Sequence, residues 1–149
     1  MYSSLARINH ELTTWAGGAR PGASSSEILS LRSRSKSVLG ISLPQTYCDL
    51  LAKNNGLNFL FLSIYGTQAF KTASLPTKRV PGFVEANMRW RKKKGLPNMV
   101  VFADTMNELH IYNVDEDEYQ TIDSLNGLPF EHFKNATALF SHILHEGLY

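Results

Sequence analysis

Residues 43–66 read LPQTYCDLLAKNNGLNFLFLSIYG, and this stretch predicts a helix, a tight cap and a buried strand. Pro44 suits the first turn of a helix because its missing N–H has no partner there in any case. Ser42 and Gln45 have the spacing of a capping box, in which two side chains bind backbone N–H groups reciprocally. We therefore expect the helix to begin at Pro44.

One face of this helix is mostly apolar. The residues that share it at helical spacing are Tyr47, Leu50, Leu51 and Asn54. Asn55 and Gly56 tolerate a left-handed backbone, so we expect the helix to end there. Residues 59–64 form an apolar run rich in aromatic side chains, which predicts one strand.

Length and composition predict one globular domain over residues 1–149. Hydrophobic residues make up 43% of the chain and charged residues 19%, which excludes general disorder. The single Cys48 excludes an internal disulfide framework, and its place in the helix predicts a packed thiol. No window holds the ~18 apolar residues that a spanning helix needs, and the start has no signal-peptide core. We therefore expect a cytoplasmic protein with no membrane partner.

The net charge of +2 hides an asymmetry between the two parts of the chain. Residues 1–99 carry 14 Lys and Arg against 4 Asp and Glu, a balance of +10. Residues 100–149 carry 1 against 9, a balance of −8, and the two balances give the total of +2. Such asymmetry indicates either a charged partner or two regions that pack together and offset each other.

Hydrophobic periodicity predicts the remaining elements. We expect helices over residues 4–16, 24–40 and 83–94 and a last helix capped by Asn135, a strand over 99–103, a hairpin over 109–122, and a loop with one short strand over 67–81. Ser24 and Glu27 form a second capping-box signature. Three successive strands near the end predict an α+β domain, with a mainly antiparallel sheet of about four to six strands and helices packed on one face.

Catalytic and metal-binding motifs are not evident. The phosphate-binding pattern GxxxxGK, the dinucleotide pattern GxGxxG and the nucleophile pattern GxSxG are missing. His142 and His145 are spaced for one helix face, but a third ligand is not apparent, and surface histidines are the simpler reading. Asp104 follows a buried strand, where it also suits the start of a turn. We expect no enzyme, no cofactor and no metal.

An acidic tetrad is the most exposed feature of the expected hairpin. Its members are Asp115, Glu116, Asp117 and Glu118. Such a patch attracts a basic cleft and speeds association with it, although a solvated turn also explains it. Tyr112 and Tyr119 flank the tetrad and are candidate anchors, since aromatic residues dominate interface energetics.

A basic edge is the alternative binding surface. It consists of Arg89, Arg91, Lys92, Lys93 and Lys94 at the end of the helix over 83–94. Cations there suit the negative end of the helix dipole, and they also suit phosphates. Trp90 lies on the apolar stripe and is expected to pack inward rather than to stack a base. Arg32, Arg34 and Lys36 form a second basic run, for which a solvated helix face is the simpler reading.

Three regions together resemble the SUKH superfamily, whose members share a fold with yeast cell-wall-assembly regulators. The first holds Leu43-Pro44, Tyr47, Leu50, Leu51, Asn55-Gly56 and Ile64-Tyr65-Gly66. The second holds Glu85, Asn87 and Arg89 before Leu96-Pro97. The third holds MVVFAD at 99–104, LHIYNVD at 109–115, and Phe133, Leu139-Phe140 and Ile143-Leu144. The resemblance covers about two thirds of the chain.

The resemblance implies a binding role. Many bacterial members are immunity proteins that neutralise a polymorphic or contact-dependent toxin, often a nuclease, by one-to-one binding. We expect such a function, without catalysis, in a monomer or weak homodimer. A scaffold or regulatory module of the same fold is the first alternative. A nucleic-acid-binding domain and an enzyme centred on Asp104 or His110 are the others.

Overall fold

The computed structural model describes residues 1–15, 19–72, 77–94 and 98–148. The helices are α1 (Tyr2–Trp15), α2 (Ser25–Arg34), the π-helical turn η1 (Ser35–Leu39), α3 (Gln45–Lys53), α4 (Phe83–Lys94) and α5 (Ala136–Gly147). The strands are β1 (Leu57–Phe59), β2 (Leu62–Ile64), β3 (Phe70–Lys71), β4 (Arg79–Val80), β5 (Met99–Asp104), β6 (Glu108–Asn113), β7 (Glu118–Asp123) and β8 (Pro129–Phe133). The expected helix over 4–16 is α1, and position 16 lies outside the described residues.

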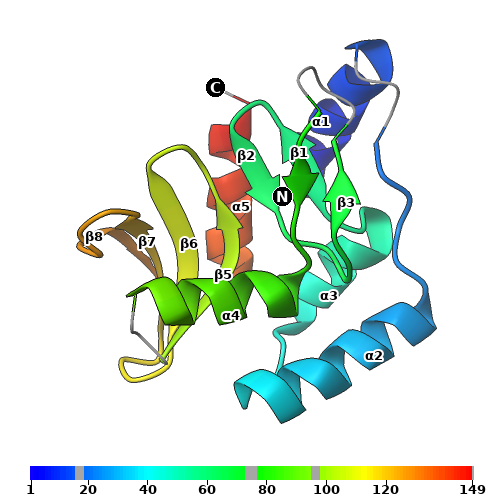
Figure 1. Ribbon diagram of the computed structural model, residues 1–149. Coiled ribbons are helices and arrows are strands. Elements are labelled where there is room, and N and C mark those ends of the chain that lie inside the picture. Colours follow the sequence, from blue (N-terminus) through cyan, green and yellow to red (C-terminus); the bar gives the residue numbers. More distant parts are fainter. Residues whose placement is uncertain (16–18, 73–76, 95–97, 149) are drawn as a thin grey trace.

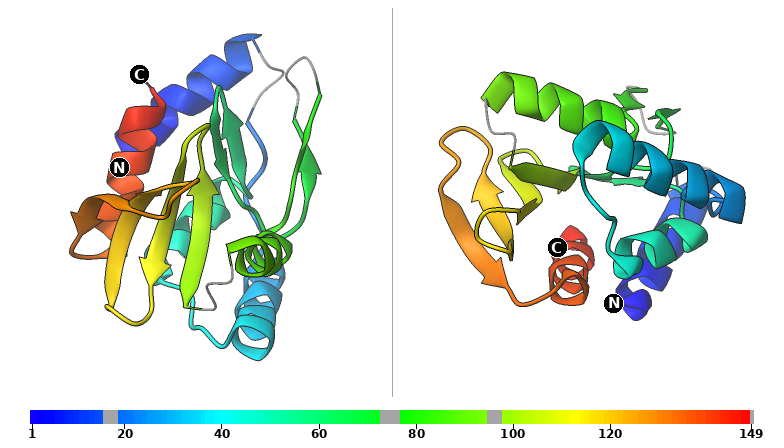
Figure 2. Two further views of the ribbon diagram at one scale, coloured as in Figure 1. Left: turned by 60° about the vertical axis from the view of Figure 1, so that its left-hand side comes forward. Right: turned by 90° about the horizontal axis from the view of Figure 1, so that it is seen from below.

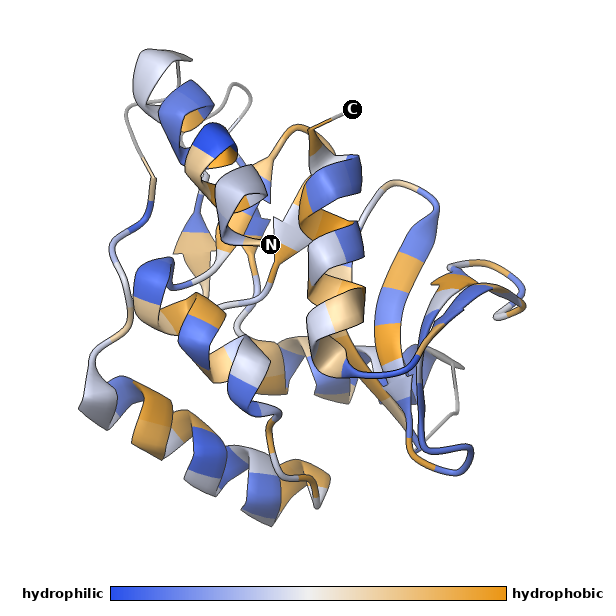
Figure 3. Ribbon diagram, turned by 180° about the vertical axis from the view of Figure 1, so that it is seen from behind, coloured by the Kyte–Doolittle hydropathy of each residue, from blue (hydrophilic) through white to orange (hydrophobic). Residues whose placement is uncertain are grey.

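One antiparallel sheet runs in the order β1-β2-β5-β6-β7-β8, and β3 pairs with β4 separately. The α+β class and the antiparallel sheet are therefore confirmed. Helices cover both faces of the sheet, so the expectation of helices on one face is wrong. In Figures 1 and 2, α5, α3 and α1 lie on one side of the sheet and α4 on the other. Figure 3 shows α1, α3 and α5 from behind, with hydrophobic and hydrophilic residues mixed along each helix.

The core is centred on Tyr47 of α3, which is fully buried. Its ring lies 5.2 Å from Phe83 of α4, 5.2 Å from Phe102 of β5 and 5.7 Å from Phe140 of α5, measured between centroids. Its hydroxyl donates to the backbone oxygen of Tyr65 at 2.5 Å, which satisfies the buried polar group. The apolar face predicted for α3 thus joins the two helix layers.

The start of α3 differs from the predicted capping box. Pro44 is the N-cap residue in an extended conformation, without a side-chain hydrogen bond, and the helix starts at Gln45. The side chain of Gln45 instead accepts from Arg32 and donates to Asp49, so it is unavailable to Ser42. The second predicted box is confirmed, since Ser24 and Glu27 bind each other's backbone N–H groups.

Residues 59–64 are not one strand, and this prediction is wrong. They form the turn of a hairpin, in which β1 and β2 pair through Phe59 and Leu62 and are joined by Leu60 and Phe61. Leu60 has φ 55°, a left-handed conformation that favours glycine. The turn has neither Gly nor Asn nor Asp, so the sequence carries no signal for it. The strand β8 and the second strand of the β3–β4 pair were also missed.

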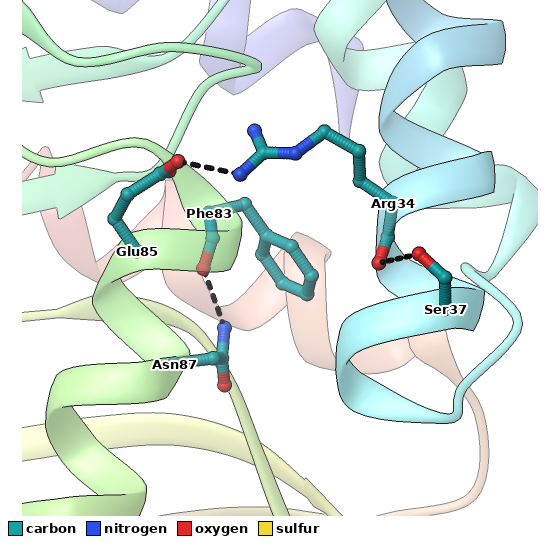
Figure 4. A network of polar contacts seen from close by, with 5 residues as sticks. All are labelled: Arg34, Ser37, Phe83, Glu85 and Asn87. Carbon is teal, nitrogen blue, oxygen red and sulfur yellow. Dashed lines mark hydrogen bonds and ion pairs between the residues drawn. The ribbon is translucent and has the colours of Figure 1, made fainter.

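Asn87 of α4 takes the place of a neighbouring strand at Val101 of β5. The strand β2 pairs with β5 only at Ala103 and Asp104. Further back, the Asn87 amide donates to the backbone oxygen of Val101 at 2.8 Å and accepts from its N–H at 2.6 Å. The same amide donates to Phe83, as Figure 4 shows. This buried side chain thereby ties α4 to the sheet.

The antiparallel order places three turns at one end of the sheet. The β1–β2, β5–β6 and β7–β8 turns lie there, and Ser124 donates to Asn107 at 2.9 Å between the last two. We call this the three-turn end. The β6–β7 turn with the tetrad lies at the opposite end, which we call the acidic end. Figure 1 shows both ends.

Candidate functional site

Three members of the acidic tetrad, Asp115, Glu116 and Asp117, lie in the predicted turn between β6 and β7, and Glu118 begins β7. Each side chain of the tetrad contacts a residue outside the tetrad. Asn98 donates to Asp115 at 2.5 Å and Tyr112 donates to Asp117. Gln120 donates to Glu116 at 3.1 Å and to Glu118 at 3.0 Å, and His132 lies 2.8 Å from Glu118.

These contacts fix the carboxylates without neutralising most of them. Asn98, Gln120 and Tyr112 are neutral donors, and within the described ranges no Lys or Arg forms a salt bridge to the tetrad. Neutral donors orient an anion while leaving its charge available to a partner. The arrangement suits electrostatic recognition of a cationic surface.

Tyr112 and Tyr119 form a cross-strand pair beside the tetrad, with ring centroids 4.8 Å apart. Both rings are half-buried and line a hollow of about 320 Å³ together with Pro44 and Phe102. The hydrogen bond to Asp117 raises the pKa of Tyr112 to about 12. The predicted partner-binding residues thus lie together on one surface.

One member of the basic edge, Arg91, turns away from solvent. Arg91 points to η1, where its guanidinium donates twice to the backbone oxygen of Leu39 at 3.3 Å. Arg89 and Lys93 line a separate pocket of about 230 Å³ beside Asp104. Lys92 is exposed, and the side chain of Lys94 lies outside the described residues.

Trp90 is held by hydrogen bonds rather than free to stack a base. Its indole N–H donates to the Tyr65 hydroxyl at 2.9 Å, and that hydroxyl donates to Asp104 at 2.5 Å. Lys93 lies 5.4 Å above the indole ring. Burial raises the pKa of Asp104, against the hydrogen bond from Tyr65, which lowers it. Burial and the Asp104 charge raise the pKa of Tyr65.

The second basic run also makes internal contacts. Arg34 forms an ion pair with Glu85 of α4 at 2.9 Å (Figure 4). Arg32 donates to the backbone oxygen of Leu43 at 3.3 Å and to Gln45 at 2.7 Å. These two cations hold α2 against α4 and α3.

Asp104 and His110 contact opposite layers and do not meet in one centre. Asp104 contacts Tyr65 on the α4 side, as described above. His110 lies on the α5 side, where its ring centroid is 6.3 Å from that of His142. Its Nδ1 lies 2.8 Å from the Thr121 hydroxyl, and burial lowers its pKa to about 3. In the described part of the chain, no three His, Cys, Asp or Glu side chains are placed to hold a metal ion.

The three-turn end carries a surface that the sequence did not reveal. Its turns expose Leu60, Phe61, Met106, Leu125 and Leu128. A groove of about 430 Å³ lies beside the β1–β2 turn, between the sheet and α5. To find this surface from the sequence, one would have to know that a turn lies within residues 59–64.

No protein-family model matches this chain, and no curated protein sequence matches it. No helix among the described residues is long and apolar enough to cross a membrane. The resemblance to the SUKH superfamily therefore rests on the quoted residues alone.

Proposed function

We propose that this chain is a SUKH-type immunity protein, which binds a basic domain of a cognate toxin in the bacterial cytoplasm and neutralises it without catalysis. The observation that carries the proposal is the acidic tetrad, whose carboxylates are held in place by mostly neutral donors. Carboxylates that are already ordered cost less entropy on binding and meet a cationic surface directly.

The tyrosine pair extends the proposed interface. Tyr112 and Tyr119 supply apolar contact area at the side of the tetrad, where a partner closes over their half-buried rings. The charges then speed encounter, and the aromatic contact slows dissociation.

Co-purification with the products of flanking genes tests the proposal. Tagged protein is expected to capture the toxic domain of a neighbouring large protein in a one-to-one ratio and to restore growth of cells that express that domain. Capture of nucleic acid alone, or of a housekeeping protein with no effect on toxicity, contradicts the immunity function. The housekeeping result favours a scaffold of the same fold.

Charge removal locates the interface. The variant D115N/E116Q/D117N/E118Q is expected to slow association at low salt by about tenfold or more. The control D49N removes an exposed carboxylate on α3 that also accepts a glutamine amide, as Glu116 does. Equal association rates for wild type, tetrad variant and control place the interface elsewhere.

A further inference from the structure

The groove at the three-turn end is built from four parts of the fold. The β1–β2 turn forms its apolar lip, while β6, β8 and α5 form its walls. The residues that define it are Phe61, Glu108, His110, Glu131, His142 and Glu146. We call it the acid-lined groove. Figure 1 shows the β1–β2 turn close to the carboxyl end of α5.

The apolar lip is exposed and conformationally unfavourable. Leu60 and Phe61 are 58% and 66% exposed, although they form a two-residue turn in which water-compatible residues are normal. Leu60 also adopts φ 55°, which a residue with a Cβ rarely does. Two adjacent large apolar side chains therefore face solvent beside a concave surface.

Within the described residues, the walls of the groove carry three carboxylates and no lysine or arginine. Glu108, Glu131 and Glu146 line the groove, and no lysine or arginine is among the described residues that line it. The nearest potential cation is His142, whose Nδ1 lies 3.8 Å from Glu131. Burial raises the pKa of Glu108, and the other two carboxylates raise it further, while His142 lowers it. The groove therefore carries an excess of negative charge, which favours a cationic ligand.

A buried imidazole lines the floor. His110 is 3% exposed and lines the groove. Its Nδ1 is engaged by Thr121, and none of the hydrogen bonds among the described residues uses its Nε2. Because burial lowers its pKa to about 3, the ring is neutral at pH 7. An imidazole nitrogen that lines a groove and that no described residue binds is available to a ligand.

We propose that the acid-lined groove binds a short segment of a partner protein in which a lysine or arginine lies next to an apolar side chain. The cation approaches Glu108, Glu131 and Glu146, and the apolar side chain packs on Leu60 and Phe61. Charge complementarity selects this occupant over an acidic or wholly apolar segment. The inference rests on the proposed function only in taking the natural partner to be a protein.

Synthetic peptides test the groove directly. The probe is Ac-GSLKLKSG-NH2, with Ac-GSLELESG-NH2 and Ac-GSSKSKSG-NH2 as the matched acidic and non-apolar peptides. Titration into ¹⁵N-labelled full-length protein is expected to shift the amide signals of Phe61, Glu108 and His142 with the first peptide, at millimolar affinity. The two matched peptides are expected to bind about tenfold more weakly or worse.

Variants separate the apolar contribution to peptide binding from the electrostatic contribution. F61S is expected to weaken binding of the Leu-Lys peptide by about tenfold, and E108Q/E131Q to weaken it by a similar factor that shrinks in high salt. M88S is the control for F61S, because Met88 is 52% exposed on α4, remote from the groove. The unfolding transition of each variant is recorded beside its titration, and an E108Q/E131Q protein that unfolds as wild type tests the charge term even if F61S is destabilised.

Three results overturn the proposal. They are equal binding of the Leu-Glu peptide, shifts confined to the acidic end, and peptide-independent self-association abolished by F61S in sedimentation. The last result makes a second copy of the chain the occupant of the groove.

The tetrad variant separates this test from that of the proposed function. If it loses the toxin but keeps the peptide, the groove is a second site. If F61S and E108Q/E131Q bind both the toxin and the peptide as the wild type does, the proposal for the groove is wrong and the immunity function is unaffected.

Discussion

The turns at the two ends of the sheet accommodate a residue at positive φ in different ways. Each contains a tight turn with a non-glycine residue at positive φ, which is Asp117 at the acidic end and Leu60 at the three-turn end. Aspartate tolerates that conformation, and its side chain accepts a hydrogen bond from Tyr112. Leucine does neither, and its side chain faces solvent. Folding explains the backbone of the first turn and not that of the second, so the second turn is a sign of a binding function that is separate from the acidic tetrad.

The largest expected effect is a loss of stability in the part of the fold that both ends share. N87A is expected to lower the free energy of unfolding by about 3 kcal/mol, because the buried N–H and oxygen of Val101 lose their partner. Urea unfolding followed by circular dichroism measures it. Both ends should keep their binding per folded molecule, so a selective loss at one end would show that Asn87 supports that end alone.

The next effect is a dependence of stability on pH that arises at the three-turn end. The pKa of His110 is about 3 in the fold and about 6.5 when unfolded, so the unfolded chain takes up a proton that the folded chain refuses. Stability is therefore lost as the pH falls from 6.5 towards 3. Between pH 6.5 and 4.5 this group is expected to cost about 2 kcal/mol.

The variant H110Q isolates that contribution, because glutamine retains a polar contact to Thr121 and does not titrate. Glu108 and His142 are present in both proteins. Unfolding curves at several pH values give the difference between them. Parallel pH dependences would mean that His110 takes up its proton in the fold as readily as in the unfolded chain.

A smaller effect compares the two turns directly. L60G is expected to gain about 0.5 kcal/mol, since relief of the left-handed strain exceeds the cost of a more flexible unfolded chain. D117G is expected to lose stability, because it removes the partner of Tyr112. Denaturant unfolding of both variants gives the comparison. A loss in L60G would show that its side chain stabilises the fold and would remove the contrast between the ends.

The smallest effect belongs to the acidic end. In D117A the pKa of Tyr112 is expected to return from about 12 towards 10, because the hydrogen bond that stabilises its neutral form is gone. Tyrosine ring signals followed by NMR between pH 9 and 12.5 measure the shift, and Y112F assigns the signal. An unchanged pKa would place Tyr112 away from Asp117 in solution.

Sequence periodicity predicted the parts of the fold whose cause is local. The helices α2, α4 and α5 and the β6–β7 hairpin follow from apolar spacing and capping residues, as with Asn135, which accepts from Ala138. The acidic tetrad was predicted because charge alone marks it. The α3 cap was not, because Arg32, which is distant in sequence, binds Gln45.

The three-turn end escaped prediction for a physical reason. A turn formed by Leu60 and Phe61 has the composition of a strand, and β8 is an exposed edge strand without regular alternation. The groove also combines residues from four separate elements, which only the sheet order brings together. Sequence spacing does not encode that proximity.

The amide of Asn87 has a consequence for association between chains. Where it binds Val101, β5 has β6 on one side and no paired strand on the side of β2, and the amide occupies the hydrogen-bonding positions that another strand would use there. Detachment of α4 therefore uncovers a strand edge inside the sheet, flanked by apolar side chains. Such an edge is a template for domain swapping and aggregation. We therefore expect the loss of Asn87 to favour misassembly as well as to weaken the attachment of α4.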